Sequence, residues 1–441
     1  MEIIVKTAQF LLSLTILVLV HELGHFLMAR LFKTRVEKFR IFFDYKFTIW
    51  KKKIGETDFG FGWIPLGGYV KIAGMIDESM DTEQMKREPQ PWEFRSKPAW
   101  QRLIIMIGGV VFNLIFAWLL YSASLQIWGE RFLSNDKIEN GLVCSEVAEQ
   151  IGFKTGDKII SIYGEKVERF SEINARIIMD APGEVAVLRN GETKTIYVRD
   201  DEVGAIINSG GFLFLSPRIP FIVGGVAEGS GAMAGGIEAG DQILGFNDLK
   251  LDFFDQYAAE TKKHAGQLVN VDLLRNNEKI QKTVLIDSLG KMGVYATSPY
   301  DLMEIETKNY GFWASIPKGF DKAKQTTVDY VKQLKMIFSP EIKTSESLGG
   351  FISIGRIFPE LWDWESFWAL TAFLSILLGV MNILPIPALD GGHVVILLFE
   401  MITGRKPSQR FLEIVQMIGI TLILFLVIYA NANDIIRYII R

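Results

Sequence analysis

The sequence predicts a polytopic α-helical membrane protein with four transmembrane helices, a membrane-associated β-hairpin region and two β-rich domains outside the membrane. Three observations support this fold class. The chain has 441 residues, of which 49% are hydrophobic, and this fits membrane helices combined with water-soluble modules. Four apolar segments are each long enough to cross about 30 Å of hydrocarbon. The stretch between the second and third segments contains a repeated sequence of soluble character.

The four apolar segments run from Ile3 to Met28, from Leu103 to Trp128, from Phe367 to about Leu398 and from about Ile414 to Ala430. Pro385 and Pro387 break the third segment, because proline cannot donate a helical hydrogen bond. The first segment is not preceded by a basic region or followed by a small-residue cleavage site, so it is predicted to be a retained transmembrane helix rather than a signal peptide.

Basic residues fix the predicted orientation, because cytoplasmic loops are rich in lysine and arginine. They cluster between Arg30 and Lys53, between Arg95 and Arg102, and between Arg405 and Arg410. With four spans these clusters fall on one side, so both termini and the long stretch after residue 129 are predicted outside. Arg437 and Arg441 oppose this assignment weakly.

The predicted parts are, in order, a first transmembrane helix (1–30), a cytoplasmic or re-entrant β-hairpin region (31–102), a second transmembrane helix (103–128), two β-rich domains (129–216 and 217–300), an amphipathic helix with a linker (301–364), a third transmembrane helix (365–400), a cytoplasmic loop (401–412), a fourth transmembrane helix (413–432) and a tail (433–441).

Composition excludes several classes of function. The net charge of -4 gives no reason to expect a nucleic-acid partner. Cys144 is the only cysteine, so the chain has no internal disulfide and no cysteine-based zinc site. Four histidines are present, of which His264, like Cys144, is interpreted as an incidental residue of the external domains.

Two histidines at the end of the first apolar segment form the sequence His-Glu-Leu-Gly-His. His21 and His25 are four residues apart, so on a helix both imidazoles project from one face and can hold one zinc ion. Glu22 lies beside them and is the candidate general base. Ionisable residues at membrane depth indicate a functional site.

The predicted third zinc ligand is Asp390, a carboxylate in the third apolar segment, where it needs a partner. An alternative is that Asp390 only caps a re-entrant turn. His393 is a less favoured fourth ligand, since a closed site would leave no position for water. Asn382 is a candidate for substrate binding or for stabilising an oxyanion, with an interhelical hydrogen bond as the alternative.

Two further motifs are candidates for substrate binding. Gly109 and Asn113 share one face of the second segment, which predicts close helix packing and a hydrogen bond from Asn113 near the site. Gly67, Gly68 and Tyr69 lie in an apolar, glycine-containing stretch that predicts a short hairpin. An open strand edge there would pair with an unwound substrate, whereas an ordinary cytoplasmic hairpin is the alternative.

The external stretch contains two copies of one pattern. Residues 152–164 match residues 236–247, each with a Gly-Asp turn before a strand, and predicted hairpins follow at 185–198 and 269–286. The pattern resembles the PDZ domain. Residues 310–340 then predict an amphipathic helix that packs on a neighbouring domain or lies at the membrane interface.

Five features cover nearly the whole chain in a fixed order. They are the His-Glu-Leu-Gly-His sequence, the 65–71 stretch, Gly109 with Asn113, the two PDZ-like domains, and the Asn-x-x-Pro-x-Pro-x-Leu-Asp-Gly sequence of residues 382–391. This series resembles the site-2 protease family of intramembrane metalloproteases, in the branch with tandem PDZ domains. The resemblance implies one Zn²⁺ per chain, bound by His21, His25 and Asp390, with Glu22 as general base and Asn382 assisting.

The resemblance also implies partners and a location. The chain would lie in the bacterial inner membrane with periplasmic PDZ-like domains. Its substrates would be single-pass transmembrane proteins of the anti-sigma factor type, already shortened by an upstream site-1 type protease, and signal-peptide remnants.

Two positions depart from the family pattern, and the sequence leaves two rival functions open. Val110 replaces a usual proline, and Phe351 stands where Gly-Pro-Ile is frequent, which puts only the local backbone in doubt. One rival is a membrane-anchored PDZ scaffold with a structural or vestigial metal site, which would have no use for Glu22. The other is a transporter, which would need paired broken helices.

Overall fold

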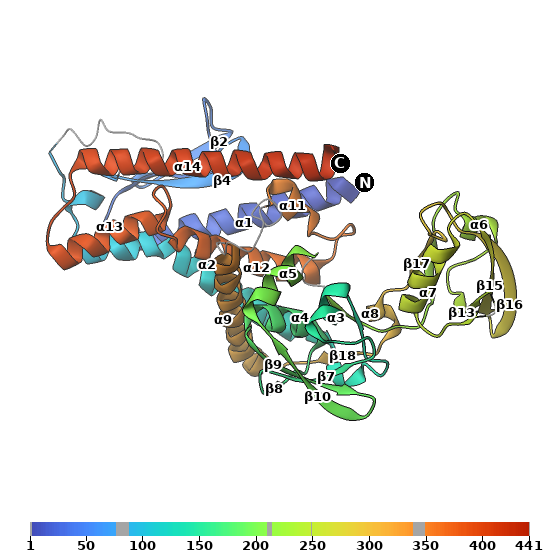
Figure 1. The fold of residues 1–441 in the computed structure, drawn as a ribbon. Coiled ribbons are helices and arrows are strands. Elements are labelled where there is room, and N and C mark those ends of the chain that lie inside the picture. Colours follow the sequence, from blue (N-terminus) through green and yellow to red (C-terminus); the bar gives the residue numbers. More distant parts are fainter. Residues whose placement is uncertain (1, 76–87, 210–213, 248, 338–348, 441) are drawn as a thin grey trace. The chain divides into compact units, whose positions relative to one another are not determined.

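The computed structural model describes residues 2–75, 88–209, 214–247, 249–337 and 349–440 (Figure 1). The chain forms two compact units. The first comprises Met1–Gly129, Asn309–Ser339 and Lys343–Arg441, and the second comprises Glu130–Lys308 with Pro340–Ile342. The apolar segments lie in the first unit, and the sequence repeats lie in the second.

The first unit contains the four helices that are long and apolar enough to span a membrane, as the sequence predicted. They are α1 (Glu2–Leu31), α2 (Ala99–Ile127), α12 (Trp364–Ile383) and α14 (Gln409–Ile435). The other helical elements of this unit are η2 (Phe94–Ser96), α9 (Phe312–Ile337), α11 (Phe351–Arg356), α13 (Asp390–Thr403) and η5 (Ile436–Ile440).

Glycines set the distance between α1 and α2. A Cβ atom on Gly24 would lie 2.4 Å from the carbonyl oxygen of Gly108, and one on Gly108 would lie 2.8 Å from that of Gly24. The two backbones therefore touch, as the small-residue face around Gly109 predicted. This contact brings α2 against the turn of α1 that carries the histidines.

The third apolar segment is two helices rather than one broken span. α12 ends at Ile383, Pro385 and Pro387 follow, and α13 begins at Asp390. The predicted boundary of 365–400 therefore combines a spanning helix with a second helix that packs on α2. The prolines explain the break, because neither can donate a hydrogen bond to the preceding turn.

A four-stranded sheet lies between α1 and α2 in the sequence, and it corrects the predicted hairpin. Its strands are β1 (Val36–Phe43), β2 (Trp50–Ile54), β3 (Thr57–Phe61) and β4 (Ile64–Ile72), in the order β2-β3-β1-β4. The stretch predicted as a hairpin forms the single strand β4, whereas β2 and β3 form the hairpin. Gly62 lets the chain cross the end of β1, since a Cβ there would lie 2.2 Å from the carbonyl oxygen of Phe43.

The predicted amphipathic helix is present as α9, and Figure 1 shows it at a steep angle to α1 and α14. It packs on α2 and α12. The indole N–H of Trp118 donates to the carbonyl of Ile316 at 2.9 Å, and Ala323 is buried in the core between these helices. The amphipathic helix is therefore present, but it packs on two apolar helices of its own unit rather than on a neighbouring domain.

The second unit contains two modules with the same strand order, β10-β9-β7-β8 and β16-β15-β13-β14. The first sheet has β7 (Lys158–Ile162), β8 (Glu165–Lys166), β9 (Gly183–Arg189) and β10 (Glu192–Val198). The second has β13 (Gln242–Phe246), β14 (Leu249–Lys250), β15 (Leu268–Arg275) and β16 (Glu278–Leu285). The predicted repeat and both predicted hairpins are confirmed.

Shorter elements complete the modules. The strands are β5 (Glu130–Leu133), β6 (Leu142–Cys144), β11 (Leu215–Pro217), β12 (Val223–Val226), β17 (Val294–Ala296) and β18 (Ile305–Lys308). The helices are η3 (Asn135–Lys137), α3 (Glu146–Ile151), α4 (Phe170–Met179), α5 (Asp200–Asn208), α6 (Gly231–Ala234), α7 (Phe254–Thr261), η4 (Lys262–His264) and α8 (Pro299–Leu302). β5 pairs with β18, so the first and last strands of the unit join.

Candidate metal centre and its cavity

His21 and His25 are buried on one face of α1, and their Nε2 atoms lie 3.3 Å apart. Nδ1 of His25 lies 2.9 Å from the carbonyl oxygen of Ile105 on α2. A carbonyl can only accept, so the proton of this imidazole is on Nδ1, and Nε2 keeps a free lone pair. The contact with α2 therefore prepares His25 as a metal ligand and orients its ring.

Asn113 orients the other histidine. The side-chain nitrogen assigned to Asn113 lies 3.1 Å from Nδ1 of His21, while its Oδ1 is buried without a hydrogen-bond partner among the described residues. When the amide oxygen faces His21, it accepts from Nδ1–H, and the lone pair of Nε2 is left for a metal ion. Asn113 itself is fully buried and does not line the cavity described below.

Gly109 gives both imidazoles the room they need. A Cβ atom there would lie 2.5 Å from Nε2 of His25 and 2.6 Å from Cε1 of His21. Real Cβ atoms essentially never approach so closely. The sequence prediction that this face of α2 lets the helix with the histidines come near is thus confirmed at atomic contact.

Asp390 reaches the histidines from the first turn of α13. Its Oδ2 atom lies 3.2 Å from Nε2 of His21 and 3.3 Å from Nε2 of His25, and it is buried without a hydrogen-bond partner in the part of the chain that the structure describes. The amino end of a helix favours a carboxylate. Gly391 permits this position, because a Cβ there would lie 2.1 Å from the carbonyl oxygen of Leu384.

The three side chains fit a zinc ion. Their nearest atoms form a triangle with edges of 3.2, 3.3 and 3.3 Å. Tetrahedral zinc with bonds of about 2.0–2.1 Å holds its ligand atoms about 3.3–3.4 Å apart. Within the described residues no His, Cys, Asp or Glu other than these three belongs to the group, so His393 is not a fourth ligand there. Three protein ligands leave one position for water or substrate, which is typical of catalytic zinc.

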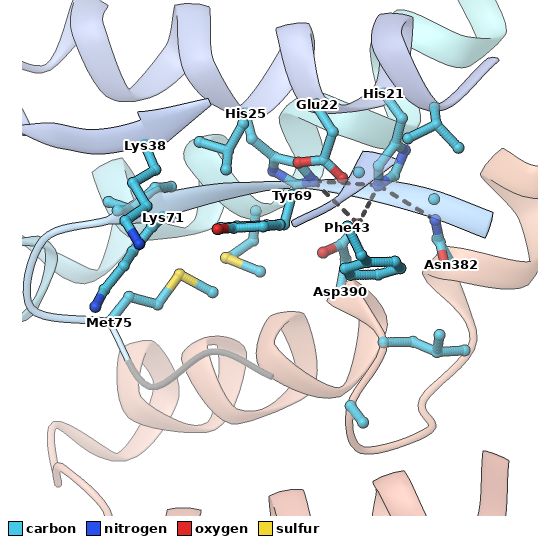
Figure 2. Close-up of a pocket in the computed structure, with 18 of the residues that line it drawn as sticks. His21, Glu22, His25, Lys38, Phe43, Tyr69, Lys71, Met75, Asn382 and Asp390 are labelled. Carbon is cyan, nitrogen blue, oxygen red and sulfur yellow. Dashed lines mark hydrogen bonds and ion pairs between the residues drawn. The ribbon is translucent and has the colours of Figure 1, made fainter. Parts of the chain in front are cut away.

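A cavity of about 520 Å³ opens onto the three side chains. Figure 2 shows the Glu22 carboxylate directed into the same space as His25 and Asp390. The other walls come from β4, from the segment between α12 and α13, and from α14. The site-lining residues thus come from elements more than 350 residues apart in the chain.

Asn382, at the end of α12, lines this cavity. Its side-chain nitrogen lies 3.2 Å from Nε2 of His21 (Figure 2). The amide is therefore next to the metal-binding position, where it can donate a hydrogen bond to a group bound there.

Gly67, Gly68 and Tyr69 of β4 also line the cavity. β4 is an edge strand of the sheet, with β1 as its neighbour. A network that sequence reasoning missed fixes Tyr69: its hydroxyl donates to Asp44 at 2.8 Å, and Asp44 accepts from the buried Arg40 at 2.8 Å. Burial opposes ionisation of Asp44, but hydrogen bonds from Arg40, Tyr69 and Thr48 outweigh it and hold the pKa below its ordinary value.

Gln416 of α14 is a second residue that the sequence interpretation did not select. It is buried and lines the cavity. One signal was available, namely a polar amide in the apolar start of the fourth segment. Asp44 had no such signal, because an acidic residue near a basic loop is ordinary.

Comparisons with known proteins agree over nearly the whole chain. Residues 9–426 match the model of peptidase family M50. The regulator of sigma E protease of Haemophilus influenzae is 28% identical over 468 residues, covering 99% of this chain and all of that protein. Protease RseP of Yersinia pestis is 28% identical with the same coverage. A Neisseria meningitidis protein whose name is that of a zinc metalloprotease is 26% identical, covering 97% of this chain and 98% of that protein.

Proposed function

From the fact that this chain belongs to peptidase family M50, the site-2 protease family, we propose that it cleaves peptide bonds within the transmembrane segments of single-pass membrane proteins. The chain is a zinc metalloprotease with four apolar helices that suit a bilayer. One observation carries the proposal of intramembrane cleavage: His21 and His25 lie in the spanning helix α1, and residues of the other three such helices, α2, α12 and α14, also line their cavity.

His21, His25 and Asp390 are the proposed zinc ligands. The support is the 3.2–3.3 Å triangle of their atoms and the buried Oδ2 of Asp390, which accepts no hydrogen bond from any described residue. Bound zinc supplies a Lewis acid that activates water and polarises a carbonyl group. Ile105 and Asn113 hold the two rings so that both Nε2 atoms face Asp390.

Glu22 is the proposed general base. It follows His21 directly in α1, and its carboxylate enters the cavity beside the ligands, where it can accept a proton from the attacking water. Asn382 is proposed to donate a hydrogen bond to the oxyanion that forms on the scissile carbonyl, or to the substrate backbone.

The edge of β4 that pairs with no other described strand is the proposed binding site for an unwound substrate. A helix hides its own peptide bonds, so a substrate must extend before it is cut, and its backbone then needs partners where no bulk water is present. Gly67, Gly68 and Tyr69 place main-chain groups on the cavity wall for strand addition. Asn113 is retained as a candidate near the substrate, with its contact to His21 as the better supported role.

The two modules of the second unit are proposed to be periplasmic PDZ-like domains. Their support is the shared strand order and the repeated Gly-Asp turns. The basic loops between spans favour the bacterial inner membrane with both termini periplasmic. We propose that the modules restrict entry to membrane proteins already trimmed by an upstream site-1 type protease.

The substrates are proposed to be anti-sigma factors, with signal-peptide remnants as a second class. The name of the Haemophilus influenzae relative, a regulator of sigma E, supports the first class. The alternative function is a membrane-anchored PDZ scaffold with a structural metal site. Glu22 speaks against it, because a closed structural site needs no base next to its ligands.

The test is cleavage of a single-pass substrate with a short external stub, in membranes, together with the zinc content of each protein. Glu22→Gln should lose cleavage by a factor of about 100 or more and keep its zinc, since it removes proton transfer alone. Glu56→Gln, which changes an exposed carboxylate of the hairpin outside the cavity, should behave as wild type. Equal cleavage by Glu22→Gln, or no cleavage by wild type despite bound zinc, would favour the scaffold.

A further inference from the structure

Gln416 is one of only three buried residues among those of α14 that the structure describes, with Gly419 and Asp434. Its side chain is 5% exposed and lines the cavity that holds the candidate metal ligands. Most other residues of this helix are exposed apolar side chains, as expected for contact with lipid. At the cavity, α14 therefore presents the amide of Gln416.

Gly419 fixes the side of α14 that faces inward. A Cβ atom on Gly419 would lie 1.9 Å from the carbonyl oxygen of Pro387, so the helix touches the backbone between α12 and α13. Gln416 lies three residues earlier, on the same face of the helix. This face of α14 thus lies next to the segment that leads into Asp390.

The amide of Gln416 makes no hydrogen bond with any residue in the described parts of the chain. Buried amides in membrane helices usually join one helix to another, and that role is not filled among these residues. The amide faces the cavity rather than closed apolar packing, since neither of its polar atoms is among the fully buried ones without a partner. The amide is therefore available to bind a ligand that has both a hydrogen-bond donor and an acceptor.

The proposed substrate geometry supplies such a ligand. In an extended chain, each residue directs its N–H and C=O to one side, and successive residues alternate sides. If a substrate strand pairs with the edge of β4, the N–H and C=O groups of every second substrate residue bond to β4. The N–H and C=O groups of the other residues point away from β4. Without partners these groups are costly at membrane depth.

We propose that Gln416 binds the substrate backbone on the edge opposite β4. The inference rests on the proposed function and names a binding residue for it. One primary amide carries a donor and an acceptor, so it can pair with the N–H and the C=O of a single substrate residue. Gln416 and β4 would then hold an unwound segment from both edges without reading its side chains.

The first experiment compares Gln416→Leu with Thr421→Val, a matched loss of a polar group on the exposed side of α14. We expect Gln416→Leu to lower kcat/KM for the single-pass substrate about tenfold, mainly through KM, because two backbone groups lose their partner. Zinc content should not change, and Thr421→Val should match wild type. Gln416→Asn should recover part of the loss.

The second experiment detects the contact directly. In a Cys144→Ser, Glu22→Gln background, which removes the native thiol and prevents cleavage, Gln416→Cys is combined with single cysteines along the substrate segment. We expect disulfide cross-links at every second substrate position, and none with Thr421→Cys. The alternation is the signature of an extended chain, and a helix-packing role for Gln416 would not produce it.

The outcomes separate the two claims. Two results overturn the role of Gln416 and leave the proposed function intact. One is a Gln416→Leu variant that cleaves at the wild-type rate. The other is the absence of alternating cross-links in folded, zinc-containing protein. A wild-type protein that does not cut the substrate, or a fully active Glu22→Gln variant, contradicts the proposed function itself.

Discussion

The buried aspartates of the β modules are neutralised in a different way from Asp390 of the first unit, although Glu400 of that unit also has an arginine partner, Arg102. In each β module an aspartate of the Gly-Asp turn receives an arginine from the neighbouring hairpin: Arg189 contacts both oxygens of Asp157 at 2.7 Å, and Arg275 contacts both oxygens of Asp241 at 2.7 Å. In the membrane unit, Asp390 faces two imidazoles and has a buried oxygen without a hydrogen bond.

This difference separates structural charge from functional charge. The modules contain their own counter-ions, fixed by bidentate geometry and repeated in both copies, so they need nothing from outside. The group around Asp390 offers three lone pairs to one point and no cation of its own, so its charge is balanced when a metal ion binds. A buried acid that the fold leaves incomplete is a better sign of chemistry than a buried acid that the fold has paired.

The largest expected effect comes from removing the incomplete charge. Asp390→Asn keeps the size of the side chain but removes the anionic ligand, so we expect loss of zinc and loss of cleavage by a factor of about 100 or more. The measurement is zinc per chain in purified protein, followed by cleavage of the single-pass substrate.

Asp241→Asn is the matched control for this substitution, because it removes a paired aspartate from a β module. It should retain zinc and cleave a substrate that lacks an external domain. If Asp390→Asn kept stoichiometric zinc, the third ligand would be another residue, and the contrast between the two kinds of buried carboxylate would be lost.

A smaller effect is expected from a glycine that makes room for the ligands. Gly109→Ala places a methyl group 2.5 Å from Nε2 of His25, so the ring must move and zinc affinity should fall about 10- to 100-fold. Gly379→Ala on α12 is the control, because its Cβ has its nearest contact at 3.6 Å, an ordinary packing distance. Competition with a zinc-binding dye measures both, and equal affinities would show that the rings tolerate the displacement.

Much of this site could be predicted from sequence because its parts are locally marked. The spacing of His21 and His25 follows from helix geometry, and Asp390 is conspicuous as an acid within an apolar segment. The orientation of His25 by Ile105 could not be predicted, since a backbone carbonyl leaves no mark in the sequence. The pairing of Asp44 with Arg40 could not be predicted either, because it depends on the path of the backbone just after β1.

The fold shows the same division. The hairpins of the modules could be predicted because each one pairs segments that are neighbours in the sequence. Asn190 and Gly191 adopt the left-handed conformation at the first of these turns. The β4 stretch is a single strand and not the predicted hairpin, because its partner is β1 and two strands lie between them in the sequence. Alternating apolar residues indicate a strand but not its neighbour. Pairing across such a separation is decided by tertiary packing.

The smallest expected effect concerns acid and the self-contained charges of the second module. Burial opposes ionisation of Asp241, but hydrogen bonds from Arg275 and from the backbone N–H of Glu238 hold its pKa below the ordinary value of 3.8. A carboxyl group whose pKa is lower in the folded state stabilises the fold above its unfolded pKa, and this stabilisation is lost as the pH falls through the folded value.

Hydrogen exchange of β13 and β15, corrected for the intrinsic effect of pH, should therefore show constant protection near neutrality and a decline below about pH 4. Asp241→Asn should remove this component of the decline, whereas Asp252→Asn, which changes an exposed carboxyl, should leave it unchanged. A decline identical in wild type and Asp241→Asn would assign the acid sensitivity to other groups and would show that this ion pair is not the charge on which the module depends.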